Sequence, residues 1–265
     1  RRIGKRGPVK VPIPGERIES VLASSFEELV TSPDKRVYLL NRSSTVLSEI
    51  PTQSVDAVIT DPPYMDNVMY SELSDFFYVW LRLALKERYR QFARPSVSRE
   101  DEAIVNPDHG KGIDYYQDTL AAVFRECHRV LKDEGLLIFT FHHGTAEAWD
   151  AVAGALRESG FAIRCIWPVH AEMDVGVPIL GKHSVKFDAI LVCRKRGAVT
   201  AELIKDREEL ATCVKAATRS MLERLEEMYS LSEADQASLF QAAAAMLYTQ
   251  GRTDLQPSSV TSLRR

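Results

Sequence analysis

The residues with the clearest chemical potential are Asp61, Pro62, Pro63 and Tyr64, which directly follow the apolar run 55–60. That run predicts a buried strand, and ligands of open α/β sheets bind at the carboxyl ends of such strands. Asp61 offers a carboxylate there. The two prolines stiffen the backbone and supply no N–H, so the Pro62 carbonyl oxygen is expected to point outward without a partner. Tyr64 offers a ring that can lie parallel to a flat substrate.

Two acceptors beside an aromatic ring suit an amine attached to a heteroaromatic base. The lone pair of such an amine is delocalised into the base, which makes the nitrogen a poor nucleophile. Acceptance of hydrogen bonds from both amine protons favours a pyramidal nitrogen whose lone pair can attack a methyl donor, and this stabilises the transition state. The alternative explanation of the four residues is a rigid turn after a strand.

The sequence around this motif resembles the amino-methyltransferases, which use S-adenosylmethionine to methylate adenine N6 or cytosine N4. The similarity runs from residue 37 to residue 196 and is strongest over 61–83, DPPYMDNVMYSELSDFFYVWLRL. Within that class it resembles a narrower group, the adenine-specific DNA methylases that carry a domain of unknown function. Shorter similar stretches lie at 128–132, 136–143, 147–149 and 167–170.

The resemblance implies a role for each residue of the motif. In that family the aspartate and the first proline carbonyl hold the target amine and the aromatic residue stacks on the base, which carries over to Asp61, Pro62 and Tyr64, with Pro63 completing the motif. It implies DNA as partner and extrusion of the base from the duplex, since a stacked base is out of reach. The implied reaction is direct methyl transfer from S-adenosylmethionine to adenine N6, with no covalent enzyme intermediate and no metal. The alternatives are methylation of cytosine N4 or of an RNA base, and a non-catalytic nucleic-acid-binding subunit of a methyltransferase complex.

Three residues are candidates for contact with the cofactor. Asn41 and Ser43 follow the predicted strand 37–40, and in similar methyltransferases this loop touches the adenine of the cofactor. Asp61 is the third candidate for contact with the cofactor. Asn and Ser are also common in turns that use local hydrogen bonds, which is the alternative for this loop.

Five residues are candidates for contact with the substrate. Asp66 and Asn67 lie just beyond Tyr64 and either contact the substrate or cap the next helix. His142 and His143 end the predicted strand 136–141, where they either contact the target nucleotide or cap the strand. Adjacent strand residues point to opposite faces, and no ligand cluster accompanies the histidines, so a metal site is not expected.

The fifth candidate, Arg94, lies in the polar insert 87–112. Long loops without structure tend to be functional, so the insert is expected to contact the nucleic-acid backbone; an ordinary solvated loop is the alternative.

Apolar runs alternate with helical patterns between residues 36 and 197, which predicts an α/β fold with a mostly parallel, Rossmann-like methyltransferase sheet. Residues 168–186 are rich in Pro and Gly and hold no helical pattern, so the last two strands are expected to form an antiparallel edge hairpin. The predicted strands are 37–40, 55–60, 136–141, 161–167 and 187–193. The predicted helices are 24–29, 70–85, 115–131, 146–159, 201–228 and 233–248, the last with Ser232 as N-cap.

This pattern divides the chain into a basic extended arm (1–35), a methyltransferase catalytic region (36–197) and a helical extension with a polar, frayed tail (198–265). The basic residues of the arm either are solvated or contact phosphate.

Two features expected of a complete methyltransferase of this kind are missing from the sequence: a glycine-rich turn after the first strand and an acidic residue after the second. The chain therefore resembles the catalytic half of the fold without most of the cofactor half. Either it is a fragment, in keeping with the absent initiator Met, or a complementary half or subunit supplies the glycine-rich loop. In both cases the chain alone is expected to bind S-adenosylmethionine weakly or not at all.

Composition narrows the class of protein. The 265 residues include 34 Lys and Arg against 37 Asp and Glu, and the net charge of −3 excludes nucleic-acid binding by bulk positive charge. No run approaches the roughly 18 apolar residues of a membrane helix, so no membrane contact is expected. The four cysteines form no CxxC pair, which favours reduced thiols and a cytoplasmic location.

Overall fold

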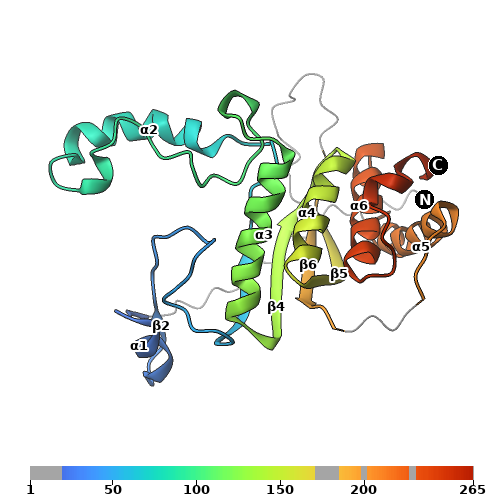
Figure 1. Cartoon of the computed structure of the whole chain (residues 1–265), viewed down its shortest axis with the longest axis horizontal. Helices are drawn as coiled ribbons and strands as arrows, with labels where there is room; N and C mark the ends of the chain where they lie inside the picture. The colour runs from blue at the N-terminus through green and yellow to red at the C-terminus, as the bar shows by residue number, and fades with distance from the viewer. Residues whose placement is uncertain (1–19, 171–184, 198–201, 227–230, 265) are drawn as a thin grey trace, which may run out of the picture.

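The computed structural model describes residues 20–170, 185–197, 202–226 and 231–264 (Figure 1). Its centre is a four-stranded mixed sheet in the order β3-β4-β6-β5. The strands are β3 (Val55–Thr60), β4 (Leu131–Phe141), β5 (Phe161–His170) and β6 (Phe187–Lys195). The chain is thus an α/β protein, as the alternation of strands and helices predicted.

The expectation of a mostly parallel sheet is wrong. Only β3 and β4 pair in parallel, whereas β6 is antiparallel to both β4 and β5. The Pro- and Gly-rich sequence 168–186 carries no helical pattern, whereas a parallel crossover from β5 to β6 would need one. The two strands return as a hairpin, as predicted, and β6 inserts between β4 and β5 so that β5 becomes the edge strand.

Helices cover one face of this sheet. The helices α3 (Ile113–Val130), α4 (Ala146–Glu158) and α6 (Glu233–Thr249) lie side by side over it (Figure 1). The strand residues on this face alternate with those on the other, and Leu137, Phe139 and Phe141 of β4 are buried beneath the helices. The largest fully buried side chains of the helical layer include Tyr116, Phe124 and Trp149.

The opposite face of the sheet is poorly covered by the described residues. Ile59 of β3 is 77% exposed and Trp167 of β5 is 53% exposed. Between them, Ile138 and Ile190 on the same face are only partly buried. These apolar side chains give the sheet a second face that is hydrophobic and accessible.

The predicted strand 37–40 is not part of the central sheet. β2 (Arg36–Val37) pairs only with β1 (Val21–Leu22), in a separate two-stranded parallel sheet. The apolar residues that suggested a buried strand stay accessible, since Leu39 is 71% exposed. Between the two strands lies the predicted short helix, α1 (Phe26–Thr31), with the Ser25 side chain accepting a hydrogen bond from Glu28 N–H. Residues 1–19 of the predicted basic arm lie outside the described residues, and residues 20–35 are folded rather than extended.

The C-terminal helices differ from the prediction at their ends. α5 (Arg207–Glu226) begins later than expected because Asp206 Oδ1 accepts hydrogen bonds from Glu208 N–H and Glu209 N–H, both at 2.9 Å. α6 begins after Ser232, which forms a capping box with Asp235, as the sequence predicted for its N-cap.

The prediction of a frayed tail is wrong. Residues Pro257–Leu263 form a 3₁₀ helix with Val260 fully buried. This helix packs on α4 and α6, where Ser258 N–H donates to Asp150 Oδ1 at 2.9 Å. Polar composition misled the prediction because the few apolar side chains of the tail all face inward. Among the described residues, no helix is long and apolar enough to span a membrane.

Candidate functional site

The motif Asp61–Tyr64 leaves the carboxyl end of β3 beside the end of β4, the placement that the sequence predicted. Asp61 is exposed, and its Oδ1 accepts hydrogen bonds from two hydroxyl groups. Tyr64 OH donates to it at 2.8 Å, and Thr140 Oγ1 of β4 also donates to it. The carboxylate is thus accessible to a substrate and is held by neighbours on two elements.

The two prolines place their carbonyl groups in different environments. Pro63 O accepts a hydrogen bond from Tyr116 OH of α3 at 2.8 Å. Pro62 is buried as a residue, yet its carbonyl oxygen accepts no hydrogen bond from any described residue. Because the Pro62 oxygen has no partner among the described residues, it is available to accept a hydrogen bond from a ligand beside Asp61.

The turn after the motif is strained and firmly attached. Met65 has a positive φ of 49°, which non-glycine residues rarely adopt, while its side chain is buried in the core. Its carbonyl accepts from Val105 N–H at 3.0 Å, and Asn67 N–H donates to Tyr64 O at 3.0 Å. Such strain persists only where the surroundings enforce it, and it is common at functional sites.

Tyr64 is half-buried between the loop and the end of β4. Its ring lies edge-to-face with Phe141 (centroids 5.2 Å apart) and with His142 (4.9 Å). Burial raises the pKa of the Tyr64 phenol, and the hydrogen bond to Asp61 and the negative charges of Asp188 and Asp61 raise it further, whereas a hydrogen bond with Thr140 opposes them. The phenol therefore stays protonated and acts as a donor.

The two histidines after β4 have different environments. The His143 side chain is buried, and both of its ring nitrogens are used inside the protein. Thr145 N–H donates to Nδ1 at 3.2 Å, so Nε2 carries the proton and donates to Asp66 Oδ1 at 2.9 Å. His143 thus ties the loop after the motif to the end of β4.

His142 is more accessible, and its Nδ1 bonds to Asp188 Oδ1 of β6. Its Nε2 makes no hydrogen bond with the described residues. His142 directly follows β4 and contacts Asp188 and Tyr64, which places it next to Thr140 on the poorly covered face of the sheet. His142 therefore remains a candidate for substrate contact, whereas the ring of His143 is fully occupied.

Thr140 and Asp188 contact the site but are not among the site residues predicted from the sequence. Each is the single polar residue in an otherwise apolar stretch, Leu-Leu-Ile-Phe-Thr-Phe in β4 and Phe-Asp-Ala-Ile-Leu-Val in β6. A lone polar residue near the site-facing end of a buried strand was the available signal.

The suggestion that Asp66 and Asn67 cap the following helix is wrong. α2 (Tyr70–Leu85) has Met69 as its N-cap, without a side-chain hydrogen bond. Its first turn is capped from elsewhere, because Ser71 N–H donates to Glu102 Oε1 at 2.8 Å. Asp66 is held by His143, and Asn67 is exposed, so both remain candidates for substrate contact.

The insert 87–112 is not structureless. It folds back along α2, with 3₁₀ turns at Arg90–Phe92 and Pro107–His109. Lys111 is buried and its Nζ donates to three backbone carbonyls of the insert, including Glu102 O at 2.8 Å. Arg99 pairs with Asp75 of α2. Polar composition suggested an open loop because the side chains that hold the insert together are themselves charged.

Arg94 occupies a different position in the same insert. Its side chain is exposed and forms no ion pair with the described residues, while its carbonyl accepts from Arg82 Nε–H at 2.7 Å. The backbone at this position is thus held and the guanidinium group is accessible.

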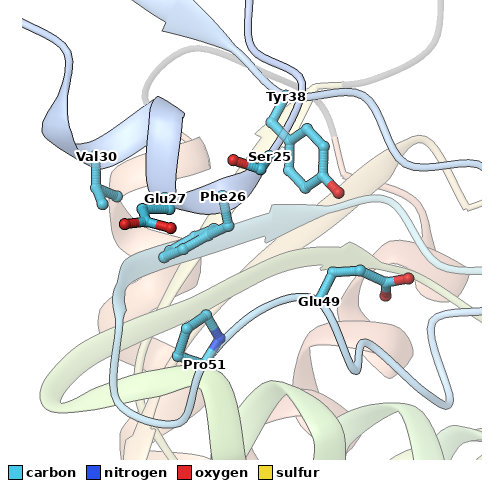
Figure 2. A pocket seen from close by; sticks show the side chains of 7 residues that line it. All are labelled: Ser25, Phe26, Glu27, Val30, Tyr38, Glu49 and Pro51. Carbon is cyan, nitrogen blue, oxygen red and sulfur yellow. The ribbon is translucent and has the colours of Figure 1, made fainter.

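The candidate cofactor residues Asn41 and Ser43 are not brought to the motif by a neighbouring strand, because β2 lies outside the central sheet. Ser43 Oγ bonds locally to Thr45 Oγ1 at 2.9 Å, and Asn41 is exposed. Nearby, α1 with its N-cap, the residue after β2 and the loop before β3 line an open, mostly apolar hollow to which no residue of the motif contributes (Figure 2). Its lining residues are Ser25, Phe26, Glu27, Val30, Tyr38, Glu49 and Pro51.

The described residues do not form a complete site for S-adenosylmethionine. β3 is followed by Asp-Pro-Pro-Tyr and β4 by His142, His143 and a single glycine, so neither strand leads into a glycine-rich turn. The described part of the chain also holds no group of three or more His, Cys, Asp or Glu side chains arranged for a metal ion.

The comparisons with known proteins find similarity only to solved structures, and that similarity is distant. No family model matches the sequence, and no curated protein matches it. A solved structure from Thermus thermophilus, provisionally assigned as a DNA modification methylase, matches with 16% sequence identity and a TM-score of 0.33. The match covers 74% of this chain and 80% of that chain. The function therefore has to be argued from the geometry of the site.

Proposed function

We propose that this chain transfers a methyl group from S-adenosylmethionine to the N6 amine of adenine in DNA. It would act as the catalytic part of an enzyme in which a complementary half or subunit supplies most of the cofactor-binding site. One observation carries the proposal. At the carboxyl end of β3, an accessible Asp61 carboxylate lies next to the unpaired carbonyl oxygen of Pro62 and the ring of Tyr64.

In this reaction the chain polarises the amine. Asp61 Oδ2, which no described residue bonds, accepts a hydrogen bond from one amine N–H, and Pro62 O accepts a hydrogen bond from the other. The nitrogen then becomes pyramidal and its lone pair becomes available for attack. Tyr64 lies against the base. The cofactor, when bound, would supply the methyl group by cleavage of its S–CH3 bond and leave as the thioether, and the methylated nitrogen would release one proton to solvent.

A complementary half is part of the proposal because two surfaces around the site lack a partner among the described residues. β3 pairs only with β4, so its other edge presents free N–H and C=O groups, which proteins normally cover. The face of the sheet that carries Thr140 and Asp61 also exposes apolar side chains, Ile59 among them. An open α/β sheet is stable when both faces are covered, so a further layer of strand and helix fits here.

Helix α2 points to the same conclusion. It projects from the body of the molecule (Figure 1), and of its residues only Ser71 is buried. Phe76, Phe77 and Trp80 are each about two-thirds exposed. A helix that is apolar over much of its surface is normally buried against another element. We place the complementary half against α2 and the free edge of β3, where it would bring the missing glycine-rich loop to Asp61.

Contact with DNA is assigned to the tip of α2 and its insert. Arg94 is exposed there, as are Arg88 and Arg90. Phosphate contacts position a nucleic acid without reading its sequence. In the site itself, His142, Asp66 and Asn67 are accessible polar side chains next to Tyr64 and the motif, and we assign them to the extruded base and its flanking backbone.

The test is methyl transfer by the chain in complex with its complementary half, with tritiated S-adenosylmethionine and duplex DNA, followed by mass spectrometry of the nucleosides. The wild-type complex should produce N6-methyladenine. Asp61→Asn keeps the size of the side chain but removes its charge, and should lower kcat by about 10²–10³-fold without loss of stability. Asp118→Asn, at an exposed carboxylate on α3, is the matched control and should have no effect.

Three results would contradict the proposal: no methylated base from the wild-type complex, wild-type activity in Asp61→Asn, or micromolar binding of S-adenosylmethionine by the isolated chain in calorimetry. N4-methylcytosine as the product would move the assignment to the other exocyclic amine.

A further inference from the structure

Thr140 is the one hydroxyl residue in the apolar part of β4, and the sheet register places it opposite the first residue of the motif. Thr60 of β3 pairs with Phe139 of β4, so Asp61 and Thr140 follow as the next pair. Their side chains lie on the same face of the sheet, opposite the face that the helices cover. The hydroxyl of Thr140 reaches the carboxylate from this position.

The hydrogen bonds at Asp61 are unevenly divided between its two oxygens. Oδ1 accepts from Thr140 Oγ1 and from Tyr64 OH, whereas Oδ2 accepts no hydrogen bond from the described residues. The two donors come from different elements, the rigid strand β4 and the loop after β3. Together they fix the plane of the carboxylate, which leaves one defined oxygen for a ligand.

We propose that Thr140 is a positioning residue that holds Asp61 so that Oδ2 faces the target amine. This inference rests on the proposed function, because it concerns the orientation of the acceptor in that reaction. Transfer of a methyl group requires the lone pair of the nitrogen to align with the methyl donor, and the lone pair is directed by where the two amine protons are held. A displacement of about 1 Å in such a group can cost about 100-fold in rate.

Tyr64 alone is a weaker support for this geometry. It lies only three residues beyond Asp61 in the same loop, so it moves with that loop. Thr140 lies in β4, which pairs with β3 as far as Phe139 and with β6, where Thr140 lies opposite Ile190. Thr140 therefore fixes the position of the Asp61 carboxylate relative to the strands of the sheet.

A structural role is the competing explanation, since threonine is a common residue of strands and its β-branched shape packs well there. Two substitutions separate these roles. Thr140→Val keeps the branched shape and removes the hydroxyl, and Thr140→Ser keeps the hydroxyl and removes the methyl group. Thr212→Val is the matched control, because Thr212 Oγ1 donates to Glu208 O within α5 at 2.9 Å, away from the site.

For a positioning role, Thr140→Val should lower kcat of the complex by about 10- to 100-fold, with KM for DNA and for S-adenosylmethionine within about threefold of wild type. Thr140→Ser should restore most of the activity. Thr212→Val should leave it unchanged. Thermal unfolding of the variants checks that none has lost its fold. Wild-type kcat in Thr140→Val, or a serine variant as slow as the valine variant, would overturn the inference.

Crystal structures of the wild-type chain and of Thr140→Val give a readout that does not depend on activity. A rotated or split Asp61 carboxylate in the variant supports positioning by Thr140, and an unchanged carboxylate overturns it. If the wild-type complex methylates no base, the proposed function fails, and this comparison still decides whether Thr140 orients Asp61.

Discussion

The hydrogen bond from Tyr116 OH to Pro63 O anchors the motif to helix α3, and its removal should be measurable in stability. Tyr116 is fully buried, and burial raises the pKa of its phenol, so the hydroxyl stays protonated and donates. Tyr116→Phe removes only that hydroxyl and leaves the ring in the core. The change therefore isolates the anchor from the packing.

The expected cost follows from the burial of the partner. When a donor is removed, a buried acceptor without access to water costs about 1–3 kcal/mol, whereas loss of an exposed hydrogen bond costs far less. Pro63 is partly buried and lies between the buried residue Pro62 and the core ring of Tyr116. We therefore expect Tyr116→Phe to lower the free energy of unfolding by about 1–3 kcal/mol.

The neighbouring tyrosine provides the control. Tyr115 OH donates to Glu100 O at an exposed position of the insert, so Tyr115→Phe should change stability by less than about 0.5 kcal/mol. Urea denaturation followed by tryptophan fluorescence measures both variants under the same conditions. Equal stabilities of the two variants would refute the argument that the loop is anchored through Tyr116. The Tyr116→Phe variant should also be slower in methyl transfer, because loss of this hydrogen bond loosens the motif that contains Asp61.

Three further outcomes are expected. Hydrogen bonds from Arg129 lower the pKa of the Glu126 carboxyl from its ordinary value of 4.5, so the contribution of Glu126 to stability is present above that pH and is lost as the pH falls through the folded-state pKa. The difference in unfolding free energy between wild type and Glu126→Gln should therefore shrink below pH 4.5. A difference that does not depend on pH would contradict this. The double variant Phe77→Ser, Trp80→Ser should reduce dye binding and self-association of the isolated chain while changing its stability by less than about 0.5 kcal/mol per site, and a large loss would mean that α2 packs within the chain. Arg94→Ala should reduce the slope of log affinity for DNA against log salt by about 0.9, and an unchanged slope would exclude a phosphate contact.

The elements with strong hydrophobic periodicity were predictable from the sequence. The bounds of β3 and α2 agree with the prediction at both ends, and α3 and α4 agree to within two residues. These segments carry clear signals: a short run rich in Val and Ile followed by Asp61 and two prolines, or apolar residues at helical spacing. The prediction for 37–40 was wrong because four apolar residues do not determine which other strand, if any, pairs with them. Partner choice is a tertiary property, and here the partner is β1 rather than β3.

At the site, the motif and its place at the end of β3 were predictable, but the neighbours that hold it were not. Thr140 and Asp188 come close to the motif only through the register of β3, β4 and β6. His143 and Asp66 are 77 residues apart in the chain, and no local pattern relates them. The insert was misjudged for a similar reason, because the ion pair of Arg99 with Asp75 depends on how the chain folds back along α2.

The polar site lies on one particular face of the sheet, and this placement determines whether a base can reach it. Asp61, Thr140 and His142 all project from the face that the described helices leave open, and they do so at the end where Ile59 leads into the motif. A site on the helix-covered face would be buried beneath α3 and α4 and closed to a base. On the open face, the same polar groups are accessible now and would be enclosed when a further layer covers Ile59 and the edge of β3. Enclosure would remove water from around Asp61 and strengthen its hydrogen bonds to the amine, so assembly itself would complete the site.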